Sequence, residues 1–342
     1  MVFSGILNTL LSGRNLARAD ASALMKAIVA GELSPACIAA AAVALRAKGE
    51  SVEELTAFAS VMRDAAVRVS APEATLDTCG TGGDGSDTFN ISTATAFVVA
   101  GMGIHVAKHG GRSASGKSGS ADVLKALGVN IECESTRVSE CIRGAGIGFM
   151  FAQSHHPGMK HVAPVRRELG IRTVFNLLGP LANPAGANLQ LLGVSHPALC
   201  EKFAAVLRNL GSHSAMVVCG AGSSERSHLD ELSTFGPTLI AHLNDDEIRT
   251  EHLDAATLGL PRPKPEQLHA GTVDESAAII RAVLSGTPGA PRDIVLLNAA
   301  AAALVAEKAS TWPDALALAA KSIDAGAAGV ALQKLTEISC GT

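Results

Sequence analysis

The stretch TLDTCGTGGDGSDTFNISTATAFVVAG, residues 75–101, joins a short apolar strand, a glycine-rich loop and an apolar helix. We expect the strand near Leu76, the loop at residues 79–87 and the helix from about Ser92 to Gly101. In parallel α/β sheets such a loop follows the carboxyl end of a strand, which is where ligands bind. The stretch therefore predicts an α/β fold and places a candidate ligand site in its loop.

The sequence after this stretch repeats the pattern of short apolar strands and helices. Further strands are expected at residues 105–107, 148–151, 189–194 and 215–219. The Ala-rich sequence from Pro291 onward predicts three helices that close the sheet. Strands that alternate with helices in this way predict a mostly parallel central sheet in a large α/β domain.

The sequence before residue 72 shows no strand pattern and predicts a small helical domain. One helix is expected at residues 34–49, between an N-cap serine and a glycine stop. The next begins at a capping box formed by Ser51 and Glu54 and runs to about Val69.

A second helical segment, residues 159–169 and 173–178, interrupts the α/β pattern and is expected to pack on the N-terminal helices. With 342 residues, the chain exceeds the usual size of one hydrophobic core. We therefore expect a helical domain of residues 1–72, completed by about 155–182, and an α/β domain of residues 73–154 and 183–342.

The composition narrows the class of protein. The 28 Lys and Arg against 32 Asp and Glu give a net charge of −4, so no basic excess is available to bind nucleic acid or an anionic membrane. With 47% hydrophobic and 18% charged residues, the chain can bury a large core. Aromatic residues make up only 3%, which favours closely packed helices over an aromatic-rich β-sandwich.

Cysteine usage and hydropathy predict a cytoplasmic protein without a membrane anchor. The seven cysteines are odd in number, widely spaced and free of any C-x-x-C pair, which argues against a disulfide framework or a zinc site. The apolar runs fall short of the roughly 20 residues that span a bilayer. Residues 1–14 lack the features of a secretory signal.

Two loops are suited to bind phosphate. The first carries four glycines at residues 80–85, so its backbone N–H groups can approach an anion, although its spacing matches neither a Walker loop nor a dinucleotide loop. The second, residues 108–120, combines Lys108, Arg112 and Lys117 with four serines and four glycines. The alternatives are a tight strand-to-helix turn for the first loop and a flexible solvated loop for the second.

Two further segments carry charged groups. Asp230 and Glu231 could hold Mg²⁺ directly or through water, although adjacent acidic residues are also common on surfaces. Residues 155–168 are rich in His and Arg but match no zinc pattern. Arg166 in this segment is either a bidentate clamp for a carboxylate or an exposed helix charge.

Taken together, these motifs closely resemble those of the anthranilate phosphoribosyltransferase family. The resemblance covers residues 20–335 in consistent order, and its motifs are GTGGD (80–84), NIST (90–93), KHG (108–110), SGSADVL (118–124), HPGMKHVAPVR (156–166), FNLLGPL (175–181) and LDE (229–231). It implies a type III phosphoribosyltransferase with a nucleoside phosphorylase-like fold, and a homodimer that forms through the helical domain.

The resemblance also implies an activity. It is the Mg²⁺-dependent transfer of the phosphoribosyl group from phosphoribosyl diphosphate (PRPP) to anthranilate in tryptophan biosynthesis, which gives N-(5-phosphoribosyl)anthranilate and diphosphate. About two Mg²⁺ ions per subunit are expected. Such a reaction needs charge stabilisation on the leaving diphosphate, from Mg²⁺, Lys108 and backbone N–H groups, and no strong base.

Residue roles follow from the same resemblance. The PRPP-binding residues would be Gly80, Gly83, Asp84, Thr88, Asn90, Ser92, Thr93, Lys108 and Ser120. The anthranilate-binding residues would be Gly80, His109, Gly111, His156, Arg166 and Gly179. The Mg²⁺ ligands would be Ser92, Asp230 and Glu231.

The chain departs from the family pattern at Gly111, where the family usually has an Asn that contacts the aromatic acceptor. Gly158, usually Ala, and the residues Ser227 and His228 are milder departures. Two other functions are alternatives. A pyrimidine nucleoside phosphorylase would lack the HPGMK and NLLGP runs, and a non-catalytic nucleic-acid-binding homologue is opposed by the net charge and by the acidic pair at residues 230–231.

Overall fold

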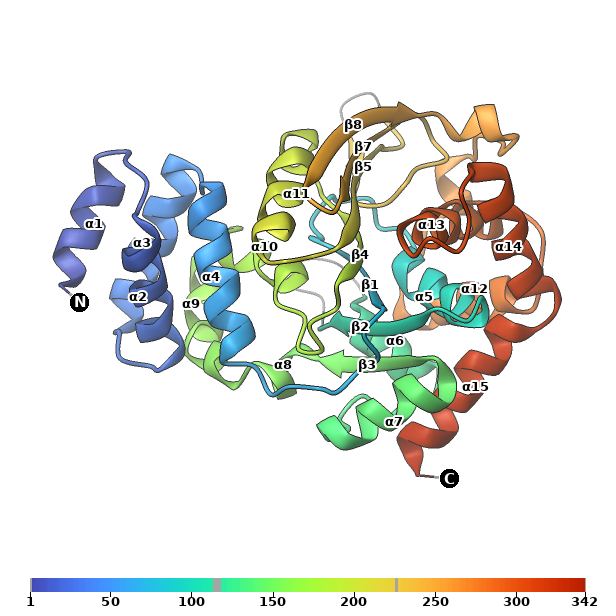
Figure 1. The fold of residues 1–342 in the computed structure, drawn as a ribbon, viewed down its shortest axis with the longest axis horizontal. Coiled ribbons are helices and arrows are strands. Elements are labelled where there is room, and N and C mark those ends of the chain that lie inside the picture. Colours follow the sequence, from blue (N-terminus) through green and yellow to red (C-terminus); the bar gives the residue numbers. More distant parts are fainter. Residues whose placement is uncertain (1, 113–117, 225–226, 342) are drawn as a thin grey trace.

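The computed structural model describes residues 2–112, 118–224 and 227–341, and Figure 1 shows a central sheet flanked by helices. The eight strands are β1 (Thr75–Gly80), β2 (His105–Gly110), β3 (Ile147–Phe151), β4 (Leu189–Gly193), β5 (Ser214–Ala221), β6 (His228–Leu229), β7 (Thr238–Asn244) and β8 (Glu247–Leu253). Their order is β3-β2-β1-β4-β5-β7-β8, with β6 paired to β5. The first five strands are parallel and the others antiparallel, so the prediction of a mostly parallel sheet is confirmed.

Two strand predictions need correction. Residues 108–110 were expected in a loop, but β2 continues to Gly110 because Lys108, His109 and Gly110 pair with residues 149–151 of β3. The antiparallel strands β6, β7 and β8 were not predicted. One of them positions part of the site: β6 pairs with β5, and the acidic pair at residues 230–231 follows directly after β6.

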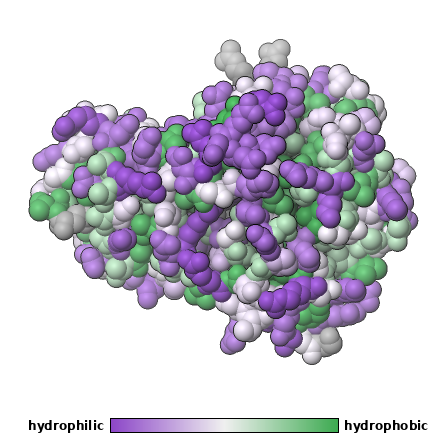
Figure 2. Space-filling model, in the orientation of Figure 1, coloured by the Kyte–Doolittle hydropathy of each residue, from purple (hydrophilic) through white to green (hydrophobic). Residues whose placement is uncertain are grey.

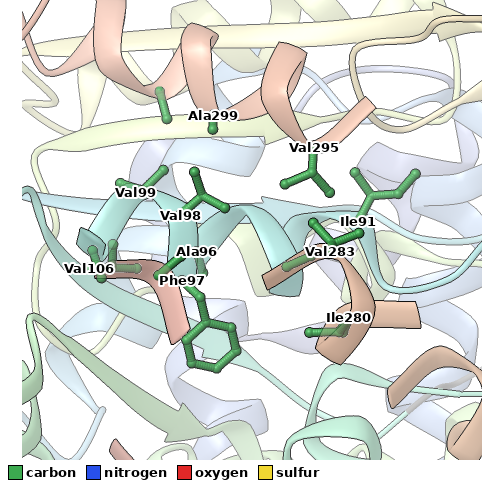
Figure 3. Close-up of a cluster of buried hydrophobic side chains, with 14 of the residues drawn as sticks. Ile91, Ala96, Phe97, Val98, Val99, Val106, Ile280, Val283, Val295 and Ala299 are labelled. Atoms are coloured by element: carbon green, nitrogen blue, oxygen red, sulfur yellow. The ribbon is translucent and has the colours of Figure 1, made fainter. Parts of the chain in front are cut away.

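One face of the sheet is covered by apolar helices. Figure 3 shows side chains of α5 (Ile91–Gly101), α12 (Val273–Leu284) and α13 (Ala290–Val305) packed on one another and on Val106 of β2. Alanines at the contacts allow the helices to approach closely, as the composition predicts. Further helices of the α/β part are α6 (Ser120–Ala126), α7 (Ser135–Ala145), α14 (Trp312–Asp324) and α15 (Ala327–Cys340), with short turns η4 (Ala255–Leu258) and η5 (Pro265–Gln267).

The first four helices are α1 (Phe3–Leu11), α2 (Arg18–Val29), α3 (Pro35–Lys48) and α4 (Val52–Asp64). Ser34 caps α3, and Ser51 and Glu54 form the predicted capping box of α4. The predicted end of α4 near Val69 is wrong. The chain leaves the helix after Asp64, since the backbone N–H of Val69 bonds to the Pro184 carbonyl instead of a helical partner.

The interrupting segment returns to these helices. It comprises α8 (Ala152–His155), η1 (Pro157–His161), α9 (Ala163–Leu169), α10 (Val174–Leu177) and η2 (Gly179–Leu181). Helices α9 and α10 contact α3, and η1 contacts α2. We therefore propose the division in which residues 1–72 and about 155–182 form one domain, and the rest of the chain the other.

The two parts share an apolar core. Helix α11 (Cys200–Asn209), which follows η3 (Pro197–Leu199), contacts α4 as well as β5 and β7. Alternate residues of the central strands face opposite sides, so Leu192 and Val217 join the cluster of the helical part while Leu191 and Val218 join that of α5 and α13. Among the described residues, no single helix is long and apolar enough to cross a membrane; only α14 and α15 taken together, bent by 58°, reach that length and hydropathy.

Candidate functional site

A cavity of about 600 Å³ lies at the carboxyl ends of β1 and β2. It brings together most of the predicted site residues: Gly80, Gly83, Asp84, Thr88, Asn90, Ser92, Lys108, His109, Gly111, Ser120, Arg166, Gly179, Asp230 and Glu231. Two predicted residues are not in its wall. Thr93 is fully buried within α5, and His156 lies behind His109. Lys117, a cation of the second loop, lies outside the described residues.

The glycine-rich loop takes a conformation that favours glycine. Gly82, Gly83 and Gly85 have φ values of 64°, 74° and 72°, in the left-handed region that other residues rarely adopt. The backbone N–H of Gly82 donates to Asp230 Oδ2 over 2.7 Å. The N-terminus of α5, with Asn90 and Ser92, faces the same cavity and adds its positive dipole end. The loop and the helix start together form an anion-binding wall.

Two glycines at neighbouring strand ends allow Asp230 to lie directly against the sheet. Gly80 pairs with Gly193 in the register of β1 and β4. A Cβ atom on Gly80 would lie 2.2 Å from Asp230 Oδ2, and one on Gly193 would lie 1.6 Å from the Asp230 carbonyl oxygen. Gly193 was not predicted to lie at the site. The sequence feature that could have indicated it is a glycine at the end of an apolar strand.

Three carboxylates crowd at this wall. Burial, and then the charge of Asp84, raises the pKa of Asp230 to about 7. Burial and the charge of Asp230 raise the pKa of Glu231 well above its usual value, against the opposing effects of Lys108 and the Ser92 backbone. Half-buried carboxylates that raise one another's pKa values would be stabilised in their charged form by a nearby positive charge.

These groups fit a divalent cation. Carboxylate oxygens of Asp230 and Glu231 and the Ser92 hydroxyl are the hard oxygen donors that Mg²⁺ prefers. Within the ranges that the structure describes, no group of three or more His, Cys, Asp or Glu lies close enough to hold a metal alone. A Mg²⁺ ion at this wall would therefore complete its coordination with water or substrate oxygens, as Mg²⁺ usually does.

Lys108 is a buried strand residue, only 2% exposed. Its ammonium donates to the Thr78 carbonyl and, over 3.2 Å, to the Ser92 hydroxyl. Burial lowers the pKa of Lys108, and the nearby Asp77 carboxylate opposes that effect. The ammonium is thereby held at the start of α5, next to the glycine-rich loop.

Asp77 and Asn183 support this arrangement and were not predicted. Burial raises the pKa of Asp77 to about 6. Its carboxylate accepts hydrogen bonds from the His109 backbone N–H over 3.2 Å and from Asn183 Nδ2 over 2.8 Å. A charged residue inside an apolar strand was the available signal for Asp77. Asn183 carried none, because it is far from the strand in the sequence.

A second part of the cavity wall is formed by imidazole, guanidinium and apolar groups. His109 Nδ1 lies 3.1 Å from the Gly179 carbonyl oxygen, and its ring meets the edge of the His156 ring with centroids 5.0 Å apart. Burial lowers the pKa of His109 to about 3 and that of His156 to about 4, so both rings are neutral at pH 7. Phe175, not predicted from the sequence, also lines this wall.

Arg166, on α9, is half-buried and lines the cavity on the same side. Among the described residues, the structure records no hydrogen bond or ion pair for its guanidinium group. Neutral rings beside a free guanidinium group suit a small aromatic molecule that carries a carboxylate. The cavity therefore combines groups that suit an anion and a metal ion with groups that suit an aromatic carboxylate.

The sequence matches two parts of one family. Residues 72–329 match the glycosyl transferase family, a/b domain, and residues 4–66 match its helical bundle domain. The anthranilate phosphoribosyltransferase of Parvibaculum lavamentivorans is 50% identical over 99% of this chain and 98% of its own length.

Solved structures agree with this match. The crystal structure of the Thermus thermophilus anthranilate phosphoribosyltransferase has a TM-score of 0.90 and 40% identity, and covers 98% of this chain and 99% of that one. The Saccharomyces cerevisiae enzyme in complex with PRPP and Mg has a TM-score of 0.90 and 27% identity over 99% of this chain and 98% of that one. A structure of the yeast enzyme with 4-fluoroanthranilate has a TM-score of 0.87, 27% identity and the same coverage.

Proposed function

The chain belongs to the anthranilate phosphoribosyltransferase family, and on that basis we propose that it transfers the phosphoribosyl group of PRPP to anthranilate in tryptophan biosynthesis. One observation carries the proposal: a single cavity is lined by the glycine-rich loop and Lys108 and also by Arg166 and the neutral His109. A pyrimidine nucleoside phosphorylase or a nucleic-acid-binding homologue has no comparable support from the relatives.

The donor would bind at the anion-binding wall. We assign it to the predicted residues that reach the cavity, which are Gly80, Gly83, Asp84, Thr88, Asn90, Ser92, Lys108 and Ser120. Thr93 is left out, because its side chain is buried away from the cavity. A yeast relative was solved in complex with PRPP and Mg, which supports PRPP as the donor.

Ser92, Asp230 and Glu231 would hold Mg²⁺, with about two ions per subunit. When bound, Mg²⁺ neutralises charge on the diphosphate of the donor. The chain itself contributes Lys108 and the N–H groups at the start of α5, which are fixed before the substrate arrives. Fixed donors of this kind stabilise the negative charge that develops on the departing diphosphate.

The acceptor would lie against His109, Gly111, Arg166 and Gly179, with His156 supporting the His109 ring from behind. Arg166 would hold the carboxylate of anthranilate, which orients the amine toward C1 of the ribose. The amine is already nucleophilic, so the reaction needs no strong base.

An activity assay tests the proposed function directly. The protein is mixed with PRPP, Mg²⁺ and anthranilate, and the loss of anthranilate fluorescence is followed together with release of diphosphate. We expect both signals at equal rates. Diphosphate release without anthranilate consumption would contradict the acceptor, and the absence of both would contradict the proposed function.

Arg166→Ala should mainly weaken use of the acceptor. The guanidinium group has no described partner within the protein, so its loss should cost a bidentate contact with anthranilate and little stability. We expect kcat/KM for anthranilate to fall by ~10- to 100-fold, the range of a charge-assisted hydrogen bond. Steady-state kinetics with each substrate varied in turn measures the effect. A larger rise in KM for PRPP would place Arg166 on the donor instead.

Gly111→Asn should tighten the acceptor site modestly. Among the described residues, a Cβ atom at this position would meet only the Ala152 Cβ, at 3.6 Å, which is an ordinary van der Waals contact. The added amide can hydrogen-bond the acceptor, and one such bond is worth about 0.5–1.5 kcal/mol, or a ~2- to 12-fold lower KM for anthranilate. Gly111→Ala is the matched control, because it adds the Cβ without the amide. An unchanged KM in the Asn variant would show that this position does not contact the acceptor.

We also propose a cytoplasmic homodimer that forms through the helical part. Val2, Leu11 and Val43, on or next to α1 and α3, are 76%, 69% and 42% exposed, and Figure 2 shows apolar surface at the tip of the molecule where Figure 1 places α1. Exposed apolar clusters mark interaction surfaces. The seven free cysteines fit the reducing cytoplasm. A monomer mass by light scattering at all concentrations would contradict the dimer.

A further inference from the structure

Arg172 lies in the short segment between α9 and α10 and lines the same cavity as the predicted site residues. Its Nη2 donates to the Thr81 carbonyl over 3.0 Å. Its Nη1 lies only 1.5 Å from the point where a Cβ atom on Gly83 would stand. The guanidinium group therefore rests directly on the glycine-rich loop, in space that a side chain at residue 83 would fill.

Arg172 has neighbouring charges of both signs. Burial lowers its pKa and the charge of Arg46 acts in the same direction, whereas the carboxylates of Asp230 and Asp84 raise it. Burial lowers the pKa of Arg166 as well, and the charge of Arg172 lowers it further. Among the described residues, the structure records no ion pair within 4.0 Å for Arg172, and the bond to Thr81 uses one of its five N–H donors. Most of its hydrogen-bonding capacity is therefore available to a ligand.

We propose that Arg172 binds the diphosphate group of PRPP, and of the product, from the helical side of the cavity. This inference rests on the proposed function and extends it by one residue. A guanidinium fork matches two phosphate oxygens at once. The loop backbone, and the acidic pair through Mg²⁺, would hold the diphosphate from the sheet side. With Arg172 on the helical side, both parts of the molecule would contact the diphosphate.

Binding of inorganic diphosphate with Mg²⁺, measured by calorimetry, tests the proposal without turnover. Arg172→Gln keeps a donor for the Thr81 carbonyl but removes the charge, and Arg172→Lys keeps the charge but removes the fork. We expect diphosphate affinity to fall by ~10- to 100-fold in the Gln variant and by less in the Lys variant. Anthranilate affinity should stay unchanged. Arg167→Gln, an exposed charge on α9, is the matched control.

Three results would overturn the inference. If the Gln variant binds diphosphate like the wild type, Arg172 only ties the α9–α10 segment to the loop. If anthranilate affinity falls and diphosphate affinity does not, Arg172 belongs to the acceptor wall. If the wild type itself binds neither Mg²⁺-diphosphate nor PRPP, the proposed function fails together with the inference. Should the Gln variant not fold, the Lys variant decides by the same comparison.

Discussion

Lys108→Ala should lower kcat by about 10²–10³ and also destabilise the protein. In the proposed mechanism the ammonium stabilises the charge of the departing diphosphate, and removal of one such fixed donor typically has an effect of that size. From the sequence, Lys108 belongs to a loop, and its loss would leave the fold intact. The structure places it inside β2, 2% exposed, so truncation of its long side chain should cost about 2–5 kcal/mol of unfolding free energy.

The two effects can be separated with Lys108→Met, which keeps most of the volume and removes the charge. Steady-state kinetics gives kcat, and urea unfolding gives stability. We expect the Met variant to be as slow as the Ala variant but closer to the wild type in stability. Turnover like that of the wild type in the Met variant, at saturating substrates and Mg²⁺, would remove Lys108 from the catalytic assignment.

Asp230→Asn should lower turnover by about 10²–10³, because one of the proposed Mg²⁺ ligands is lost, yet make the metal-free protein more stable at alkaline pH. Burial and Asp84 raise the pKa of Asp230 to about 7. The folded state therefore binds this proton more tightly than the unfolded chain. The stabilisation from protonation is complete below pH ~4 and is lost as the pH rises through 7. An Asn side chain stays uncharged and avoids that loss.

The difference in unfolding free energy between the variant and the wild type should grow by about 1–3 kcal/mol in favour of the variant from pH 5 to pH 9. Urea unfolding in EDTA-containing buffer measures it, with the exposed Asp246→Asn as control. Mg²⁺ with diphosphate should raise the Tm of the wild type more than that of Asp230→Asn. A constant difference across the pH range would show that Asp230 is not crowded by its neighbours.

The parts of the fold that were predicted have a local signal in the sequence. The Ser51 capping box, the strand at β1 and the glycine-rich loop each depend on residues close together in the chain. The mostly parallel sheet follows from alternating strands and helices. Strand β8 gave no such signal, because polar residues occupy both of its faces and most of them are exposed. Its pairing with β7, rather than an apolar pattern, holds it in the sheet.

The same distinction applies to the site. Motif residues such as Lys108, Asp230 and Arg166 were found because their chemical types are unusual together. Asn183 and Arg172 act through contacts with residues far away in the chain, and nothing near them in the sequence marks those contacts. Gly193 also acts at a distance, and its one signal is its place at the end of an apolar strand. Thr93 is a different case: it lies within a motif, but its side chain is buried in α5 and does not line the cavity.

The apolar cluster that runs from α1 through α4 and α11 to β5 and β7 limits how this chain can be divided. A protein whose domains meet through polar surfaces can exchange them as modules in evolution or by engineering. If the helical part were transplanted without α11, the face of α4 that packs on α11 would be exposed to water. If the α/β part were made without α4, the face of α11 that packs on α4 would be exposed instead. Changes in the two parts must therefore remain compatible, and the helical part and the sheet are expected to diverge in sequence as one unit.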